Sequence, residues 1–321
     1  MRTRLLGVVA LAVCALPQAH AQEAYPTRPI RMIVPFPPSA ASDFLARTVG
    51  QRLGERYGQQ VVIDNRPGAG GLVGSTLIAR AAPDGYTIGM IGQPHLVNPL
   101  LHKDASYRAL ADTTAVIEVA ALPNVLVVTP ALPAKSVADL IALAKAKPGA
   151  LNFGSAGIGS SSHVAAEAFK AAAGIDVVHI PFKLLSDVFT EMVAGRVQFY
   201  VFPLPATMPM LREGKLRAMA VGTPKRTPSL PDVPTIGESG LAGFVTESWF
   251  GVVGPAKMPR AIVVKLNRDI NDILNTADTR ERFLRQGAEA AGGTPEAFQK
   301  LLQMEYLRYQ KLVKDAGIST Q

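Results

Sequence analysis

The sequence is short of cysteine, of aromatic side chains and of long apolar runs. Cys14 is the single cysteine among 321 residues, which excludes an internal disulfide framework and a zinc site built on cysteines. Aromatic residues make up only 6% of the chain, and the basic residues are dispersed and poorly interleaved with them, which argues against nucleic-acid binding. Beyond residue 21 no segment offers about 18 uninterrupted apolar residues, so we expect a soluble mature chain.

The composition nevertheless supports a large folded core. Hydrophobic residues make up 48% of the chain, which excludes an intrinsically disordered protein. The length of 321 residues exceeds what one core usually fills, so two domains are expected. The formal charge of +8 results from 33 Lys and Arg against 25 Asp and Glu. Spread over the surface, such a charge favours anions modestly and specifies none.

The N-terminus has the three parts of a secretory signal. Its start is basic, residues 5–16 are apolar, and residues 19–21 (AHA) supply the small residues that precede a signal-peptidase cut. A lipoprotein signal built on Cys14 fits less well, because the residue before this cysteine is bulky. We therefore expect residues 1–21 to be a signal peptide that is cleaved after Ala21.

Strands alternate with helices through most of the remaining chain. Residues 30–36 alternate apolar and polar positions, Ser42 or Asp43 can cap the helix that follows, and Gly58 suits its left-handed end. Further strands are predicted at residues 61–63, 86–91, 125–129, 151–153, 177–182, 198–202 and 216–221. This rhythm is typical of α/β domains and predicts parallel sheets with helices on both faces.

The order of segments predicts two domains with a hinge. Proline and glycine interrupt residues 222–243, which we expect to be a long loop, and a strand and two strong helices follow. We predict a discontinuous first domain from residues 22–121 and 242–321 and a second domain from residues 122–241. Ligands of open α/β sheets bind beyond the carboxyl ends of the strands, so the expected site is the cleft between the domains.

No catalytic constellation is visible. The sequence GESGL at residues 237–241 lacks the second glycine of a nucleophile elbow. The sequence GSAGIG at residues 154–159 has the glycine spacing of a phosphate-binding loop, but Ser160 stands in place of the lysine. No histidine lies four residues from another, so no helical metal face exists. We therefore predict a protein that is not an enzyme and has neither a cofactor nor a metal.

Two strand-to-helix turns instead carry binding chemistry. Residues 36–43 (FPPSAASD) and 154–163 (GSAGIGSSSH) are rich in small and hydroxyl residues. Free backbone N–H groups at a helix N-terminus, together with nearby hydroxyls, form a cradle for an anion without a lysine. One such turn in each domain predicts an anion site between the domains.

The same residues resemble a known family. The chain is similar over essentially its whole mature length to the Bug-type periplasmic receptors, the solute-binding components of tripartite tricarboxylate transporters. The resemblance rests on YPTRPI (25–30), VPFPP (34–38), NRPGAGG (65–71), APDGYT (82–87), NP (98–99), GKLRA (214–218), LPDVPT (230–235) and WFG (249–251).

The resemblance implies a periplasmic-binding-protein fold of type II-like character, in which a hinge joins two α/β domains around an interdomain ligand cleft. It further implies a monomeric periplasmic protein that captures a small carboxylate, partly through ordered water, and delivers it to the permease subunits of the transporter. The implied contacts are Phe36, Ser39, Ala40, Ser42 and Asp43 in the first turn, Gln93 and His95 after the third strand, Ser155, Gly157, Gly159, Ser160, Ser161 and His163 in the second turn, and Phe182 and Lys183 at the next strand end. A ligand sensor for a signalling system and an exported α/β hydrolase remain as alternatives.

The sequence departs from the family pattern at three places. Ser39 and Ala40 stand where the family commonly has two glycines, and Leu184 and Leu185 replace glycine and small residues. Prolines 203 and 205 lie near the next strand end. These departures predict a ligand with an apolar or aromatic body and at least one carboxylate. Alternatively, the two leucines point into the core and leave the pocket unchanged.

Overall fold

The computed structural model describes residues 25–38, 40–102 and 105–315. The predicted signal peptide and Ser39 lie outside the described residues. The strands are β1 (Ile30–Val34), β2 (Val61–Asn65), β3 (Thr87–Gly92), β4 (Thr113–Val128), β5 (Asn152–Ser155), β6 (Val178–Pro181), β7 (Phe199–Pro203), β8 (Arg217–Val221), β9 (Glu247–Pro255) and β10 (Glu289–Ala290). The helices are α1 (Ala41–Tyr57), α2 (Leu72–Ala79), α3 (Pro94–Leu101), α4 (Val137–Ala146), α5 (Ser161–Ala173), α6 (Leu185–Val193), α7 (Leu204–Arg212), α8 (Arg260–Leu274), α9 (Ala277–Arg285) and α10 (Pro295–Asp315). Within this described part of the chain, no helix is long and apolar enough to cross a membrane.

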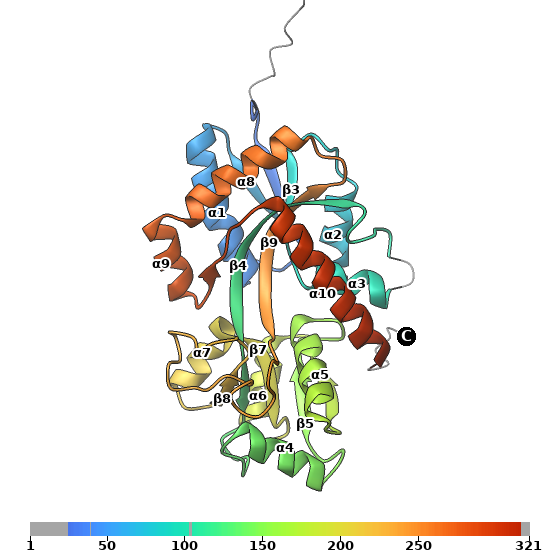
Figure 1. The fold of residues 1–321 in the computed structure, drawn as a ribbon, viewed down its shortest axis with the longest axis vertical. Helices are drawn as coiled ribbons and strands as arrows, with labels where there is room; N and C mark the ends of the chain where they lie inside the picture. The colour runs from blue at the N-terminus through green and yellow to red at the C-terminus, as the bar shows by residue number, and fades with distance from the viewer. Residues whose placement is uncertain (1–24, 39, 103–104, 316–321) are drawn as a thin grey trace, which may run out of the picture.

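Two lobes share the long strands β4 and β9 (Figure 1). The first lobe contains β1, β2, β3 and β10 with α1–α3, α8 and α9, and the second contains β5–β8 with α4–α7. Strand β4 pairs with β9 from Thr113 to Pro123 and then with β7 and β8 from Asn124 onward. The strand predicted at residues 125–129 and the strand predicted after the loop at residues 222–243 are thus parts of two long strands that run between the lobes.

The sheets are mixed, so the prediction of parallel sheets is wrong in part. Strand β1 is parallel to β2 and β3, and β5 is parallel to β6 and β7. Strands β4 and β9 are antiparallel to each other and to the neighbours they pair with in each lobe. One of them carries the chain into the second lobe and the other carries it back, so they run in opposite directions.

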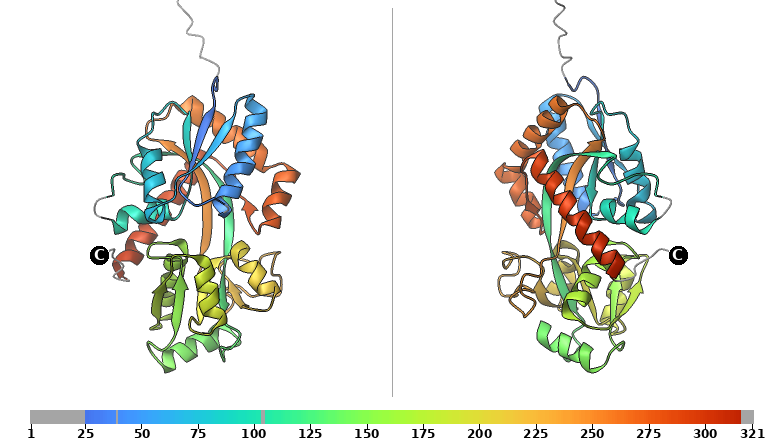
Figure 2. Two further views of the ribbon diagram at one scale, coloured as in Figure 1. Left: turned by 180° about the vertical axis from the view of Figure 1, so that it is seen from behind. Right: turned by 45° about the vertical axis from the view of Figure 1, so that its right-hand side comes forward.

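Helices cover both faces of each lobe, as the alternation predicted. In the first lobe, α1 and α8 pack on one face and α3 and α10 on the other. In the second lobe, α4 and α5 cover one face, and α6 and α7 cover the other. Helix α10 runs diagonally from the first lobe to α5 (Figure 2), and Val164 of α5 belongs to the buried cluster beneath it.

Local patterns predicted most of the helices and missed three of them. The stripe Leu45, Val49 and Leu53 of α1 is buried, and Gly58 ends this helix with a φ of 61°. Ser136 is the N-cap of α4, and its hydroxyl accepts a hydrogen bond from the N–H of Asp139. Helices α3, α7 and α9 were missed. Two prolines made α7 resemble a broken segment, but Pro205 lies in the first turn, where a proline lacks no hydrogen bond, and the helix accommodates Pro209 in its interior.

Candidate functional site

A cavity of about 360 Å³ lies between the two lobes, and the first turns of α1 and α5 open into it. Leu122 of β4 and Phe250 of β9 form part of its wall, so the strands that connect the lobes also line the cavity. The lining residues are Phe36, Ala40, Ala41, Ser42, Phe44, Leu45, Leu122, Ser161, Leu185, Phe202, Pro203, Pro205, Ala206, Phe250, Gln286 and Ala288. This lining contains no ionisable side chain, so recognition of charge by these described residues falls to backbone amides, hydroxyls and one carboxamide.

The first turn of α1 presents donors that the helix itself does not use. The N–H groups of Asp43 and Phe44 bond to the carbonyl of Ala40, whereas the first N–H groups of a helix, here those of Ala41 and Ser42, have no intrahelical acceptor. The hydroxyl of Ser42 is buried, with only 1% of the residue exposed, and has no protein partner within the described chain. The positive end of a 17-residue helix thus borders the cavity at Ala41 and Ser42.

The prediction that Ser42 or Asp43 caps α1 is wrong, because Ala40 occupies the N-cap position and offers no side-chain acceptor. Asp43 lies in the first helical turn, and its side chain stabilises the turn through hydrogen bonds. Its carboxylate accepts hydrogen bonds from Asn65 at 2.9 Å and from Arg47 at 3.0 Å. Asn65 also donates to the carbonyl of Phe36 at 3.2 Å, which ties the end of β1 to the helix. The carboxylate is therefore used in hydrogen bonds to Asn65 and Arg47, and Asp43 does not line the cavity.

The first turn of α5 faces the cavity from the second lobe. Ser160 is its N-cap and accepts a hydrogen bond from the N–H of His163 at 3.3 Å. Ser162 turns inward and accepts from the N–H of Ala156 at 3.0 Å. Ser161 lines the cavity, so the first turn of α5 borders it from the second lobe as the first turn of α1 does from the first lobe.

The residues predicted after β3 are buried beside the site. Gln93 donates to the carbonyl of Glu247 at 2.9 Å and thereby joins α3 to the start of β9. His95 stacks on Tyr107 with ring centroids 5.0 Å apart, and its Nε2 lies 3.3 Å from the carbonyl of Ala109. Full burial lowers the pKa of His95 to about 4. Neither residue lines the cavity in this conformation.

The departures from the family pattern shape the second-lobe wall. Leu185, Pro203 and Pro205 all line the cavity, so they replace polar or small surfaces by apolar ones. Leu184 is 61% exposed, which contradicts the alternative that both leucines point into the core. Lys183 is also exposed and lies outside the lining.

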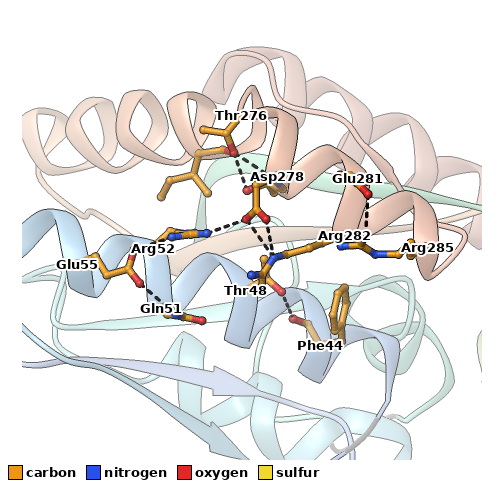
Figure 3. A network of polar contacts seen from close by, with 12 residues as sticks. Phe44, Thr48, Gln51, Arg52, Glu55, Thr276, Asp278, Glu281, Arg282 and Arg285 are labelled. Atoms are coloured by element: carbon orange, nitrogen blue, oxygen red, sulfur yellow. Dashed lines mark hydrogen bonds and ion pairs between the residues drawn. The ribbon is translucent and has the colours of Figure 1, made fainter.

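Gln286 and Ala288 reach the cavity from the segment after α9, which the sequence patterns did not indicate. Figure 3 shows how α9 is held against α1: Arg52 of α1 and Arg282 of α9 both bond to Asp278, at 2.7 Å and 3.0 Å. Because α9 is docked on α1, the residues that follow it are carried to the mouth of the cavity.

The cavity therefore collects part of the predicted site. Of the predicted residues it brings together Phe36, Ala40, Ser42 and Ser161. The predicted residues outside its lining are Asp43, Gln93, His95, Ser155, Gly157, Gly159, Ser160, His163, Phe182 and Lys183. The residues that sequence reasoning missed are mainly apolar side chains, among them Phe44, Leu122, Phe202 and Phe250, which line the cavity although they are far apart in sequence.

A larger space of about 700 Å³ lies between residues 223–228 and the segment from α9 to β10. Its charges are of both signs, since Lys225, Arg226 and Arg280 face it together with Glu247 and Glu289. No helix N-terminus is among its lining residues. The smaller cavity is therefore the better candidate for binding an anion.

Comparison with known proteins agrees with this architecture. The model of the tripartite tricarboxylate transporter family receptor matches residues 45–318. BugT of Bordetella pertussis is 35% identical, with 98% of each chain covered. The structure of Rhodopseudomonas palustris Rpa4515 with adipate is 38% identical with a TM-score of 0.82, covering 92% of this chain and 99% of that one. MatC of the same species, with bound malate, is 30% identical with a TM-score of 0.79, covering 90% and 100%.

These matches confirm the predicted α/β binding-protein fold and the predicted resemblance. They also confirm that the protein is a receptor and not an enzyme, because the matched family consists of solute-binding receptors. The chain belongs to the receptor family of the tripartite tricarboxylate transporters, the family of the Bug proteins.

Proposed function

We propose that the protein captures a small organic carboxylate with an apolar or aromatic body in the cavity between its lobes and delivers it to a tripartite tricarboxylate-type permease. The observation that carries the proposal is the pair of helix N-termini, α1 and α5, that open into one cavity from opposite lobes. Helix N-termini favour negative charge, and their first N–H groups are ready donors for carboxylate oxygens.

The hydroxyl of Ser42 supports the same assignment. A buried polar group without a partner costs free energy, so such groups are uncommon unless they serve a ligand. Ser42 lines the cavity at the N-terminus of α1, where a carboxylate oxygen can accept from its hydroxyl. Ser161 offers a second hydroxyl from the opposite lobe.

The walls select the body of the ligand. Phe36, Leu185, Phe202 and Phe250 surround the two N-termini with apolar surface. An alkyl chain or aromatic ring gains from contact with such walls, whereas a hydroxyl group would lose its hydration with few partners in return. Rpa4515, bound to the alkyl diacid adipate, and MatC, bound to malate, show that relatives bind carboxylates of either kind.

The route of β4 and β9 suggests how the cavity opens. We assign residues 22–121 with 242–321 to one domain and residues 122–241 to the other, with the boundary inside β4. Bending of β4 and β9 would separate the two helix N-termini, and a carboxylate held by both would draw the domains together. We further assign the protein to the periplasm after removal of residues 1–21.

A thermal-shift panel tests the ligand class. The purified protein is heated with adipate and with aromatic acids, and in parallel with succinate, malate and citrate. A ligand at a hundred times its dissociation constant stabilises the folded state by about 2.7 kcal/mol, which a melting curve resolves readily. Stabilisation only by succinate, malate or citrate would reject the apolar body. Stabilisation by no carboxylate would reject the binding function.

A variant at the second helix N-terminus tests the location. Ser161→Phe fills the cavity but leaves the cap residue Ser160 in place, so we expect carboxylate binding to be lost and the melting temperature without ligand to be kept. Ser186→Phe on the exposed part of α6 is the matched control, because it adds the same bulk outside the cavity. Unchanged affinity in Ser161→Phe would reject this site.

Delivery to a permease requires a separate experiment. Uptake of radiolabelled ligand is measured in cells that contain the permease, with and without the receptor and with the Ser161→Phe variant. Uptake that depends on a binding-competent receptor supports transport. A receptor that binds ligand and leaves uptake unchanged would favour the alternative of a ligand sensor.

A further inference from the structure

Three aromatic rings stack in the second lobe, directly behind the turn that leads into α5. The rings of His163 and His179 lie 4.0 Å apart at 14°, and those of His179 and Phe153 lie 4.8 Å apart at 18°. His163 belongs to α5 and His179 to β6, so the stack joins two elements that flank the turn. Only 4% of His163 is exposed, and neither histidine lines the cavity.

Both histidines bond to the turn itself. The N–H of Gly159 donates to Nδ1 of His163 at 3.1 Å. Nε2 of His179 lies 2.6 Å from the hydroxyl of Ser155, which in turn accepts from the N–H of Gly157 at 3.1 Å and donates to the carbonyl of Gly157 at 3.1 Å. All these bonds are satisfied when both rings are neutral and protonated at Nε2.

The surroundings of His163 and His179 favour the neutral form of both rings. Burial lowers the pKa of His163 to about 3, and the neighbouring His179 and Lys170 act in the same direction. Burial and Lys170 likewise lower the pKa of His179 to about 4. Glu167 lies 3.9 Å from Nε2 of His163, at the ring edge that carries the proton.

The hydrogen bonds within the turn determine which of its backbone N–H groups are left for a ligand. The N–H groups of residues 156, 157, 159 and 160 all donate within the turn or to His163. Gly157 and Gly159 adopt φ values of 105° and 77°, which side chains other than glycine rarely tolerate. The turn therefore has a demanding backbone conformation, and in this conformation the first N–H groups of α5 are left for a ligand.

We propose that His163 and His179 are positioning residues, which hold the turn from Ser155 to Ser160 so that Ser161, the first residue of α5, faces the carboxylate. This inference rests on the proposed binding of a carboxylate and differs from the predicted direct contact of His163 with the ligand. Both rings act from behind the turn, His163 on the amide of Gly159 and His179 on Ser155.

Matched pairs of variants separate positioning from packing. His163→Asn keeps an acceptor where Nδ1 stands, whereas His163→Leu fills similar volume without one. His179→Gln keeps a donor where Nε2 stands, whereas His179→Leu does not. Because each leucine leaves a bond of the turn unmade, we expect adipate to bind about tenfold or more weakly to the leucine variants, and within about threefold of wild type to the amide variants. Isothermal titration calorimetry measures the affinities and thermal melting the stability.

Two calorimetric results would overturn the inference. One is wild-type affinity in both leucine variants, and the other is equal loss in the amide and leucine members of each pair. Nitrogen NMR of the ligand-free wild type adds a test that does not need the variants to fold. We expect Nδ1 of His163 to resonate as an unprotonated nitrogen that is coupled to the amide of Gly159, and a protonated Nδ1 would also overturn the inference. If wild type binds no carboxylate, the proposed function fails, and the NMR result alone decides the role of His163.

Discussion

The substitution Ser42→Ala is expected to separate ligand binding from stability. In the ligand-free protein the hydroxyl of Ser42 makes no hydrogen bond to the described residues, so its removal breaks no protein contact. We therefore expect the free energy of unfolding to stay within about 0.5 kcal/mol of wild type, or to rise slightly. In the proposed complex the same hydroxyl would donate to a carboxylate, and a hydrogen bond to a charged group contributes about 1.5–3 kcal/mol. The dissociation constant should accordingly rise by about 10- to 150-fold.

Ser248→Ala is the matched control for this prediction. Ser42 and Ser248 are both buried serines, with 1% and 2% of their surface exposed, but the hydroxyl of Ser248 donates to the side-chain carbonyl of Asn124 at 3.0 Å and lies outside the cavity. Its removal should lower the free energy of unfolding by about 1 kcal/mol and leave the affinity unchanged. Urea unfolding and calorimetry with adipate give the two quantities for each variant. The reasoning would be refuted if Ser42→Ala lost stability as Ser248→Ala does and kept its affinity.

Three further predictions concern the strand that joins the lobes, the apolar wall and the second turn. Burial, followed by nearby carboxylates, raises the pKa of Glu118 on β4 to about 7, so the folded protein holds this proton up to a higher pH than the unfolded chain does. The contribution of Glu118 to the free energy of unfolding is complete below about pH 4 and is lost as the pH rises through 7. Urea unfolding of wild type should therefore show a lower free energy at pH 8 than at pH 5, and Glu118→Gln should remove the part of this difference that is due to Glu118. Leu185→Ser makes the cavity wall polar and should lower the ratio of adipate affinity to malate affinity, and an unchanged ratio in calorimetry would place the selectivity elsewhere. Gly159→Ala puts a methyl group 2.6 Å from Leu101 at a φ of 77°, so the melting temperature should fall. The fall should be smaller when Gly159→Ala is introduced into the Leu101→Ala variant than into wild type, because the clash is absent there and only the backbone strain remains.

Much of the fold, and the two helix N-termini at the candidate site, could be predicted from local sequence. Strand-to-helix turns are formed by neighbouring residues, so the small and hydroxyl residues at 36–43 and 154–163 indicated the N-termini of α1 and α5 directly. The apolar spacing in α1 likewise reported its buried face. The mixed pairing of β4 and β9 was not predicted, because strand direction in a sheet depends on where the chain crosses between the lobes.

The walls of the cavity depend on contacts between distant segments, and so do the hydrogen bonds of the turn at residues 154–163. Local patterns missed both for this reason. Leu122, Phe202 and Phe250 meet only because β4 pairs with β9 on one side and with β7 on the other. Gln286 reaches them only because α9 is bound to α1 through Arg52, which is 226 residues from its partner Asp278. The serine-rich turn shows the same dependence at a finer scale. Its composition indicates an anion site, but composition does not tell which hydroxyls and amides are already used. Part of that selection is made by His179 on the neighbouring strand, which bonds to Ser155, and by His163 in the first turn of α5, which accepts from the amide of Gly159. His163 resembles a ligand contact in the sequence, but in the structure it lies outside the lining of the cavity.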